Sequence, residues 1–307
     1  MLTHFGTATL VPFWEASVVC VGTFDGVHRG HAHVIETAVR NALTQKLPCA
    51  LVTFDRHPAQ VLRPESRPPV LGTLEQNLRV IRSLGVSVCV ILPFDRAMAE
   101  TPAERFAEEI FDRHLRARQV VIGHDFAFGH HRRGTPEWLS AHYDTVVVPP
   151  YAPEGQRISS TAIRELVATG QVESAAKALG RPFALAGVVV PGQQLGRKLG
   201  FPTANLARSL EQVVPADGIY AGWAHIDGRV FAAATSIGVR PTVGGEDRTV
   251  EAYLLDYPGD EIYGRAMEIS FVHRLRPEMK FDSVEELVHQ MHEDVRHVRE
   301  KLNFRSS

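Results

Sequence analysis

The first half of the chain alternates short apolar runs with longer stretches in which apolar residues recur at helical spacing. The runs predict strands at Val18–Val21, Ala50–Phe54, Val86–Leu92, Val120–Ile122 and Thr145–Val148. The stretches between them predict helices at Ala32–Leu43, Leu74–Leu84 and Ala103–Leu115. This succession indicates an α/β domain with a parallel sheet, which binds ligands at the carboxyl ends of its strands.

The pattern changes near Arg181-Pro182, after two predicted helices that begin at Ser159–Thr161 and at Val172. Beyond it, short β-rich runs separated by Gly or Pro predict a closed antiparallel barrel. These runs are Ala184–Val190, Gly218–Ile226, Val230–Ser236, Glu251–Leu255 and Met267–Phe271. A long final helix is expected over Ser283–Leu302, capped by Asp282 or Ser283, with an apolar face made by Val284, Leu287, Val288, Met291 and Val295. We therefore expect two domains, 1–182 and 183–307.

Charge and cysteine content indicate which partners and which cellular compartment to expect. The 307 residues carry 33 Lys and Arg against 35 Asp and Glu, a balance that argues against a nucleic-acid partner. Cys20, Cys49 and Cys89 each lie inside an apolar run and are expected to be core residues in a reducing compartment. No signal peptide and no membrane-spanning run is recognisable, so a cytoplasmic location with no membrane partner is expected.

The segment Gly22–His31 (GTFDGVHRGH) is the first candidate site, because it joins a predicted strand to a predicted helix. Free backbone N–H groups and the helix dipole favour a phosphate at such a junction. Gly26 and Gly30 leave the backbone accessible, and His28 and His31 add two donors. The alternative is a pair of exposed or core histidines without a chemical role.

Two further loops strengthen the first interpretation. Arg157–Arg164 (RISSTAIR) offers hydroxyls, arginines and a helix N-terminus to a polyphosphate, although an ordinary cap with surface arginines has the same pattern. Gly123–Gly129 (GHDFAFG) interleaves aromatic and polar residues, which suits a flat ring system. Its alternative is a loop that plugs the sheet edge with Phe126 and Phe128.

The second half contains no P-loop motif but carries Gly196–Asn205 (GRKLGFPTAN). Its glycines predict a flap that covers phosphate. Thr203 and Asn205 lie two residues apart, so on an extended segment they face the same side. Both offer the oxygen ligands that Mg²⁺ prefers, whereas the alternative is a polar turn in which Thr203 satisfies its own backbone.

These motifs resemble the two halves of prokaryotic bifunctional riboflavin kinase/FAD synthetases. The first three match the adenylyltransferase half, in order and spacing, from residue 1 to about 182. The riboflavin kinase half is similar over 183–305, through Leu199–Leu206, Gly218–Gly222, Ile237–Thr242, Val250–Asp256 and Leu275–Phe281. The resemblance implies a Rossmann-like nucleotidylyltransferase domain followed by a compact β-barrel kinase domain that ends in a long helix.

For the first half, the resemblance implies that the phosphate of FMN attacks the α-phosphorus of ATP and releases pyrophosphate. Catalysis then consists of positioning and charge neutralisation, with Mg²⁺ as the metal. The implied catalytic residues here are His28, His31 and Arg164. The implied nucleotide-binding residues are Gly22, Phe24, Gly30, Arg157, Ser159, Ser160 and Thr161, and the flavin-binding residues are Asp125, Phe126 and Phe128.

For the second half, the resemblance implies transfer of the γ-phosphoryl group of ATP to riboflavin. Thr203 and Asn205 would hold Mg²⁺-ATP, with Gly196 and Lys198 on the nucleotide. Glu251 would act as the general base, because an alcohol is a poor nucleophile. The alternative for Glu251 is a solvent-facing strand residue.

Three positions depart from the family pattern. Tyr253 and Ser236 stand where the family commonly has His and Asn, and Arg56 stands where it has Pro. The last departure leaves the role of the neighbouring His57 open between a site residue and a structural one.

The preferred hypothesis is one enzyme that makes FMN and then FAD from riboflavin and ATP. A second hypothesis retains only one of the two activities. A third makes the barrel a flavin-binding sensor, against which the presence of Thr203, Asn205 and Glu251 argues, since a sensor needs neither a metal site nor a base. No pattern in the chain predicts an oligomeric state.

Overall fold

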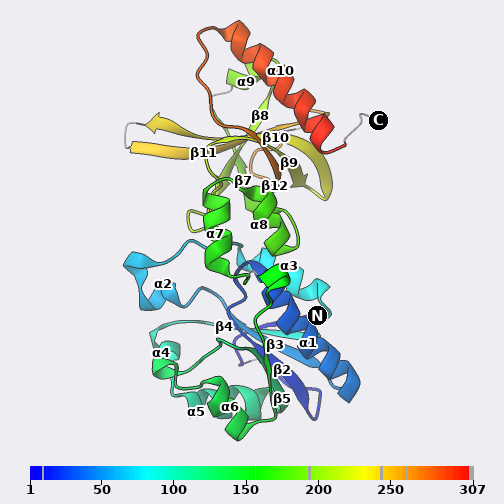
Figure 1. The fold of residues 1–307 in the computed structure, drawn as a ribbon, viewed down its shortest axis with the longest axis vertical. Helices are drawn as coiled ribbons and strands as arrows, with labels where there is room; N and C mark the ends of the chain where they lie inside the picture. Colours follow the sequence, from blue (N-terminus) through cyan, green and yellow to red (C-terminus); the bar gives the residue numbers. More distant parts are fainter. Residues whose placement is uncertain (9, 156, 193–194, 243–244, 260, 304–307) are drawn as a thin grey trace. The chain divides into compact units, whose positions relative to one another are not determined.

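A computed structural model describes residues 1–8, 10–155, 157–192, 195–242, 245–259 and 261–303 (Figure 1). The chain forms two compact units, Met1–Ser160 and Thr161–Ser307, and each is described by itself. Within the described ranges, no helix combines the length and the apolar character needed to cross a membrane.

The first unit is built on a six-stranded sheet with the order β1-β4-β3-β2-β5-β6, in which every pairing is parallel. The strands are β1 (Leu2–Phe5), β2 (Ser17–Val21), β3 (Cys49–Phe54), β4 (Val88–Leu92), β5 (Ala117–Gly123) and β6 (Thr145–Val148). The predicted parallel sheet is confirmed. The edge strand β1 was not predicted, because it is only four residues long and its two apolar residues, Leu2 and Phe5, do not form a continuous run.

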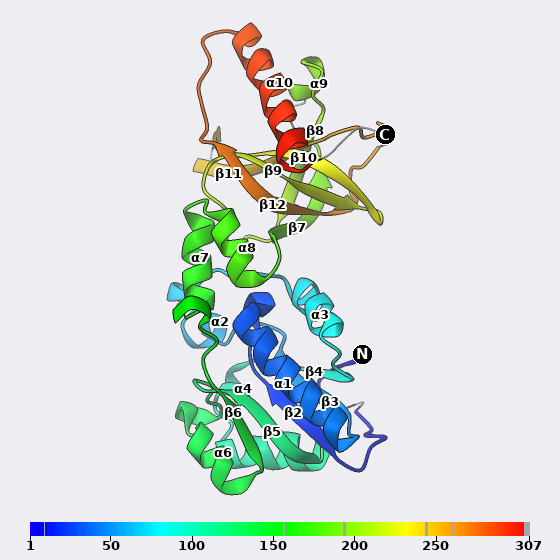
Figure 2. The same cartoon turned by 45° about the vertical axis from the view of Figure 1, so that its right-hand side comes forward.

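Burial on both faces explains why the central strands are continuous apolar runs. Alternate residues of β2 enter different cores: Val19 and Val21 pack on one side of the sheet, and Val18 and Cys20 on the other. Helix α1 (Arg29–Gln45) packs against β2, β3 and β5 through Val34, and it runs along one face of the sheet (Figure 2).

The cysteines are buried, as predicted for core residues. Cys20, Cys49 and Cys89 lie on the three adjacent strands β2, β3 and β4 and are unbridged. Burial raises the pKa of Cys49 and of Cys89 to about 12. These thiols are therefore inert in the folded chain.

Short helices complete the first unit. They are α2 (Ala59–Leu62), α3 (Leu74–Ser83), α4 (Arg96–Ala99), α5 (Ala103–Phe106) and α6 (Pro136–His142), with 3-10 turns at Asp25–Val27, Pro64–Ser66, His130–Arg132 and Pro153–Gly155. The single α-helix expected over Ala103–Leu115 is instead α5 followed by a π-helix, Ala107–His114. Helix α1 starts earlier than expected, because His28 caps it.

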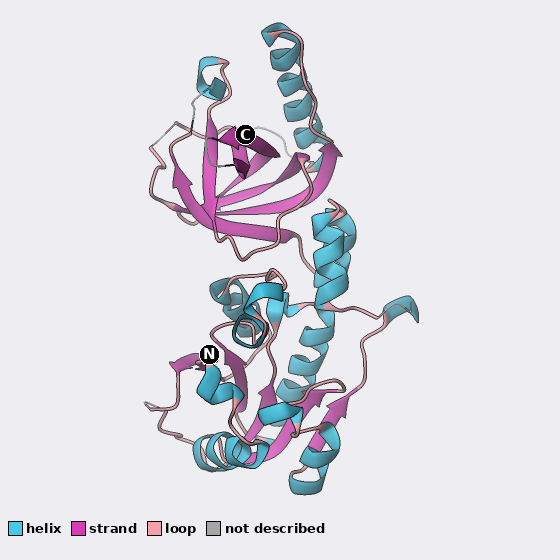
Figure 3. Cartoon of the chain, turned by 90° about the vertical axis from the view of Figure 1, so that its left-hand side faces the viewer, coloured by secondary structure: helices cyan, strands magenta, loops and turns pink. Residues whose placement is uncertain are grey.

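The second unit contains the predicted antiparallel barrel, closed in the order β10-β11-β8-β7-β12-β9 (Figure 3). Its strands are β7 (Phe183–Val190), β8 (Thr203–Arg208), β9 (Gly218–Ile226), β10 (Arg229–Thr242), β11 (Gly245–Leu254) and β12 (Ala266–Arg276). Its helices are α7 (Ser160–Ala168), α8 (Val172–Leu179), α9 (Leu195–Lys198) and α10 (Val284–Lys301), and α7 starts on the last residue of the first unit.

Helix α10 confirms the predicted final helix and one of its two candidate caps. Ser283 accepts a hydrogen bond from the Glu286 amide. The apolar face was wrong at its start, because Val284 is 56% exposed, whereas Val298 further along is buried. The helix packs on the barrel beside Tyr253 of β11. The face of β11 that carries Tyr253 is therefore on the outside of the barrel.

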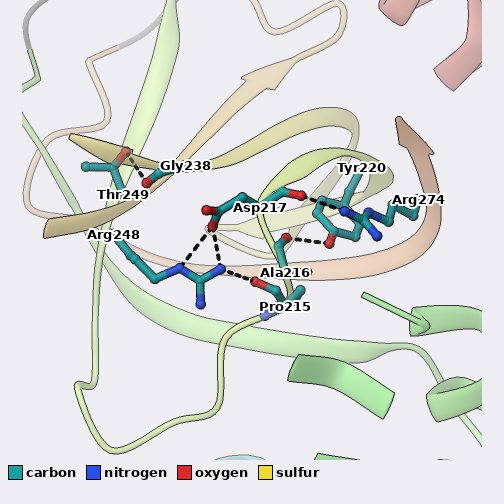
Figure 4. Close-up of polar contacts among 8 residues, drawn as sticks. All are labelled: Pro215, Ala216, Asp217, Tyr220, Gly238, Arg248, Thr249 and Arg274. Atoms are coloured by element: carbon teal, nitrogen blue, oxygen red, sulfur yellow. Dashed lines mark hydrogen bonds and ion pairs between the residues drawn. The ribbon is translucent and has the colours of Figure 1, made fainter. Parts of the chain in front are cut away.

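The connection between β8 and β9 is fastened to two other strands by charged contacts (Figure 4). The Asp217 carboxylate accepts from Arg248 on β11 at 2.5 and 3.0 Å. Its main-chain oxygen accepts from Arg274 on β12 at 2.8 Å. The Tyr220 hydroxyl donates to the Ala216 carbonyl at 2.5 Å. The loop that follows the Thr203–Arg208 strand is thereby fixed.

Helix α8 also belongs to the barrel unit by its contacts. Glu173 accepts from the Arg274 amide at 3.1 Å and lies 3.3 Å from the His273 ring. The compact units divide after Ser160. The expected boundary between the two functional domains, after residue 182, stays a prediction.

Candidate active sites

The first candidate site begins where β2 ends. The turn Asp25–Val27 leads into α1, and His28 forms the N-cap of that helix in an extended conformation. The Nδ1 atom of His28 accepts a hydrogen bond from the His31 amide at 3.2 Å. A helix N-terminus with this geometry satisfies one of its free donors internally and leaves others for an anion.

The two histidines of the motif lie together. The His28 and His31 rings stack with centroids 3.7 Å apart and planes 16° apart. Because Nδ1 of His28 is an acceptor, the proton of its neutral ring sits on Nε2.

The turn that carries His28 has an unusual backbone. Phe24 and Val27 have φ values of 48° and 36°, and Gly26 has a φ of 72°. Left-handed conformations cost a non-glycine residue about 1 to 3 kcal/mol each and persist only where the surroundings hold them. A branched residue such as Val27 is rarely found there. The site thus stores strain next to its histidines.

Phe24 was expected to bind nucleotide, and the structure places its side chain elsewhere. The ring is 3% exposed and belongs to the core on one face of the sheet. Only its main chain is left to face a ligand. A Cβ on Gly22 would lie 2.8 Å from that ring, and one on Gly30 would lie 3.1 Å from the His28 ring. A side chain at Gly22 would thus force the Phe24 ring to shift, whereas one at Gly30 would require only a small adjustment of the His28 ring.

The second predicted loop meets the third through an ion pair. Arg157 donates to the Asp125 carboxylate at 2.7 Å, and both side chains are exposed. Arg132 donates to the Asp125 main-chain oxygen at 3.2 Å. This ion pair places Asp125, which was predicted to bind flavin, next to Arg157, which was predicted to bind nucleotide.

The two aromatic residues of the GHDFAFG loop differ in burial. Phe128 is 6% exposed, and its ring centroid lies 5.1 Å from that of Phe106 and 5.8 Å from that of Trp138. It fills the core, which is the alternative considered for this loop, so we do not assign it to flavin. Phe126 is only partly buried and stacks on Phe128 at 5.8 Å.

The RISSTAIR loop is divided between the two units. Ser159 and Ser160 belong to the first unit, where the Ser160 hydroxyl donates to the Asp25 carbonyl at 3.4 Å. Thr161 and Arg164 lie further along α7, in the second unit. Their approach to the histidines stays a prediction.

In the barrel, the predicted metal ligands and base come together. The Thr203 hydroxyl on β8 donates to Glu251 Oε2 on β11 at 3.2 Å. Asn205 lies directly opposite Glu251 in the antiparallel ladder. Residues opposite each other share a face of the sheet, so all three side chains point to the same side.

This side is the outer face of the barrel. The neighbours Ala204, Val250 and Ala252 are buried and point the other way, whereas Thr203 and Glu251 are only partly buried. Strand alternation therefore presents oxygen donors outside while the inside is filled with apolar groups.

The segment before β8 passes over these donors. A Cβ on Gly192 would lie 2.2 Å from the Asn205 side-chain nitrogen, and one on Gly196 would lie 3.5 Å from Thr203 Oγ1. Lys198 ends α9 and is exposed. The predicted flap residues Gly196 and Lys198 thus belong to a segment that covers the proposed metal ligands.

Two of the three departures from the family pattern, Ser236 and Tyr253, lie beside the proposed base. Ser236 on β10 lies opposite Glu251 on β11, and Tyr253 on β11 lies opposite Thr203 on β8. In the first unit, His57 accepts from the Ala59 amide at 3.1 Å, which gives it a structural role at α2.

Sequence reasoning missed two contacts around the first site. Asp25 is buried inside the motif and binds a distant segment; its position as a charged residue between an aromatic residue and a glycine is a signal that could have revealed it. Tyr151 accepts from Arg29 at 2.5 Å and lies under its guanidinium at 5.1 Å, with no local signal to reveal it.

Comparison with known proteins matches both halves of the chain. A FAD synthetase family model matches residues 11–162 and a riboflavin kinase model matches residues 179–302. A bifunctional riboflavin kinase/FMN adenylyltransferase of Haemophilus influenzae is 35% identical over 92% of each chain, and one of Bacillus subtilis is 35% identical over 91% of this chain and 90% of its own. The chain belongs to this family.

A crystal structure described as a macrolide-efflux protein from Streptococcus pneumoniae is also similar to this riboflavin kinase/FMN adenylyltransferase family member. It superimposes with a TM-score of 0.88 at 32% identity, over 97% of this chain and 99% of that one. The comparisons confirm the predicted family, its two enzyme activities and the order of the halves, with FAD synthetase first and flavokinase second.

The oxygen donors of this flavokinase half suit a divalent cation. Hydroxyl, amide and carboxylate oxygens are hard ligands, and Mg²⁺ takes only one or two of them beside substrate phosphates. Among the described residues, no cluster of three or more His, Cys, Asp or Glu side chains forms a metal cage. Thr203 and Asn205, the predicted metal ligands, offer two such oxygens beside Glu251, the predicted base.

Proposed function

We propose that this chain phosphorylates riboflavin to FMN in its barrel and adenylylates FMN to FAD in its parallel-sheet domain, with ATP as the donor for both steps. The contact between Thr203 and Glu251, with Asn205 opposite, carries the kinase assignment. The stacked pair His28 and His31 at the end of β2 supports the second assignment.

In the barrel, Glu251 is the proposed general base. It takes the proton of the ribityl 5′-hydroxyl as that oxygen attacks the γ-phosphorus, because a hydroxyl is too weak a nucleophile unaided. Thr203 and Asn205 are the proposed holders of Mg²⁺. When bound, the cation neutralises charge on the phosphate oxygens. Gly196 and Lys198 lie on the segment proposed to cover the nucleotide.

In the first domain, the nucleophile is already an anion and no base is required. The FMN phosphate attacks the α-phosphorus of ATP, the bond to the β-phosphate oxygen breaks, and pyrophosphate leaves. His28 donates from Nε2 to the developing charge, with His31 beside it. Arg164 is the third proposed catalytic residue.

The binding roles in the first domain follow the two loops. The proposed polyphosphate contacts come from the main chain of Gly22, Phe24 and Gly30 and from the side chains of Arg157, Ser159, Ser160 and Thr161. Asp125 and Phe126 are proposed for the flavin side. The ion pair between Asp125 and Arg157 would then connect the flavin-binding side of the site to its polyphosphate-binding side.

We further propose that residues 1–182 and 183–307 are the two functional halves. A cytoplasmic location is proposed as well, because three unbridged cysteines suit a reducing compartment.

The test is incubation of the purified protein with riboflavin, ATP and Mg²⁺, followed by chromatographic separation of the flavins. We expect FAD, with FMN as a transient intermediate. FMN alone would leave the first domain without activity, and unchanged riboflavin would support the sensor hypothesis. A parallel reaction with EDTA should form neither product.

A further inference from the structure

Asp25 lies inside the motif proposed to bind phosphate, and its carboxylate is bound by a segment far away in the sequence. The residue is 6% exposed. Its carboxylate accepts from the Leu71 amide at 2.9 and 3.1 Å and from the Gly72 amide at 3.3 Å. A free carboxylate in this turn would repel a polyphosphate, and its capture by backbone N–H groups removes it from the ligand side.

A second bond joins the same two segments. Asn77, in the first turns of α3, accepts from the Gly26 amide at 3.1 Å through Oδ1 and lies 3.4 Å from the Gly72 carbonyl through Nδ2. A Cβ on Gly26 would lie 2.7 Å from the Leu71 Cβ, so side chain and backbone are in close contact there. We call Leu71–Asn77 the brace segment.

The brace segment is itself well fixed. Thr73 caps α3 and forms a reciprocal capping box with Gln76. Leu71 is buried. A rigid helix start is therefore attached at two points to the strained turn that carries His28.

We propose that Asp25 and Asn77 are positioning residues for adenylyl transfer, a proposal that rests on the proposed function of this domain. Through the brace segment they hold the turn in its left-handed conformation. That conformation places the His28 ring at the N-terminus of α1, where it caps the helix. Neither side chain touches the substrate.

The test compares Asp25→Asn and Asn77→Leu in the full-length protein. The amide of Asn at position 25 replaces one acceptor by a donor that faces backbone N–H groups, and Leu at position 77 removes the acceptor for Gly26 at similar volume. We expect the kcat for FAD formation from FMN to fall by about 10- to 100-fold in each, with kcat/KM falling in parallel. Riboflavin kinase activity of the same preparations should not change.

The double variant sharpens the test. If both residues act on one turn, the double variant will be little slower than the slower single variant, whereas independent effects multiply. Asp95→Asn is the matched control, because this exposed N-cap of α4 tolerates Asn equally well and lies outside the brace segment. Its rates should equal those of the wild type.

The proposal is overturned if a folded single variant keeps kcat within about twofold of the wild type. It is also overturned if KM alone rises, or if both activities fall together in a folded variant. Should Asp25→Asn fail to fold, as judged by loss of cooperative urea unfolding of the first unit, Asn77→Leu decides alone. A wild-type protein that forms no FAD would refute the function of the domain instead, which keeps the two failures distinct.

Discussion

The two halves of this enzyme both use ATP, but their candidate sites are built from different structural elements. In the first unit, the candidate site is made of a strained turn, a helix N-terminus and loops at the ends of parallel strands. In the barrel, it is made of side chains on the faces of paired strands. The difference follows the nucleophile: a phosphate needs its repulsion relieved, whereas a hydroxyl needs its proton removed.

The sharpest way to break this comparison is Glu251→Gln. The variant keeps the shape of the side chain but cannot take a proton, so FMN formation should fall by about 10³-fold. FMN-to-FAD conversion should remain, because it requires no base. The two rates are measured separately by supplying riboflavin or FMN. An unchanged kinase rate would remove Glu251 as the base.

The reciprocal change is His28→Ala together with His31→Ala. Loss of the donor and of the helix cap should slow FAD formation by about 10²- to 10³-fold and leave riboflavin phosphorylation intact. Initial rates with FMN and with riboflavin check this. A parallel loss of both rates in a folded protein would show that the halves are coupled.

A stability change in the barrel unit gives a smaller contrast. Asp294 on α10 is buried and accepts from Arg276 on β12 at 2.7 and 2.9 Å. Asp294→Ala leaves a partly buried guanidinium without its carboxylate and should cost about 3 kcal/mol. Urea unfolding followed by kinase activity measures it. Glu300→Ala, which removes an exposed partner of Arg296, is the control and should leave the midpoint unchanged.

The smallest effect is expected for thiol reagents. Cys20, Cys49 and Cys89 all lie in the first unit and are buried, so the native protein should react negligibly at pH 8, where the raised pKa of Cys49 and of Cys89 keeps them protonated. Ellman titration in urea should reveal them only as the first unit unfolds. Rapid labelling of the native protein would contradict the buried sheet.

Much of the fold could be predicted because apolar runs dictate buried strands. The sheet from β2 to β6 and the barrel follow that rule. The strand β8 was not predicted, because its T-A-N-L-A-R sequence alternates small and polar residues. The start of α10 was misjudged, because apolar spacing cannot show where a helix leaves the surface it packs on.

The candidate sites were predicted from motifs, and motifs do not reveal which side chains turn inward. Phe24 and Phe128 stand next to chemical residues, yet both fill the core. The partners of Asp25 lie 46 and 47 residues away in the chain, so only the tertiary fold brings them together. Thr203 and Glu251 are 48 residues apart, and the strand register makes them neighbours.

The alternation along β8 and β11 makes the kinase half intolerant of a particular kind of evolutionary change. A single inserted or deleted residue in either strand would swap its two faces. Glu251 would then be directed into the hydrocarbon interior, and Val250 into solvent. We therefore expect length variation among relatives to fall in the loops of this half and not in the strands that hold the donors.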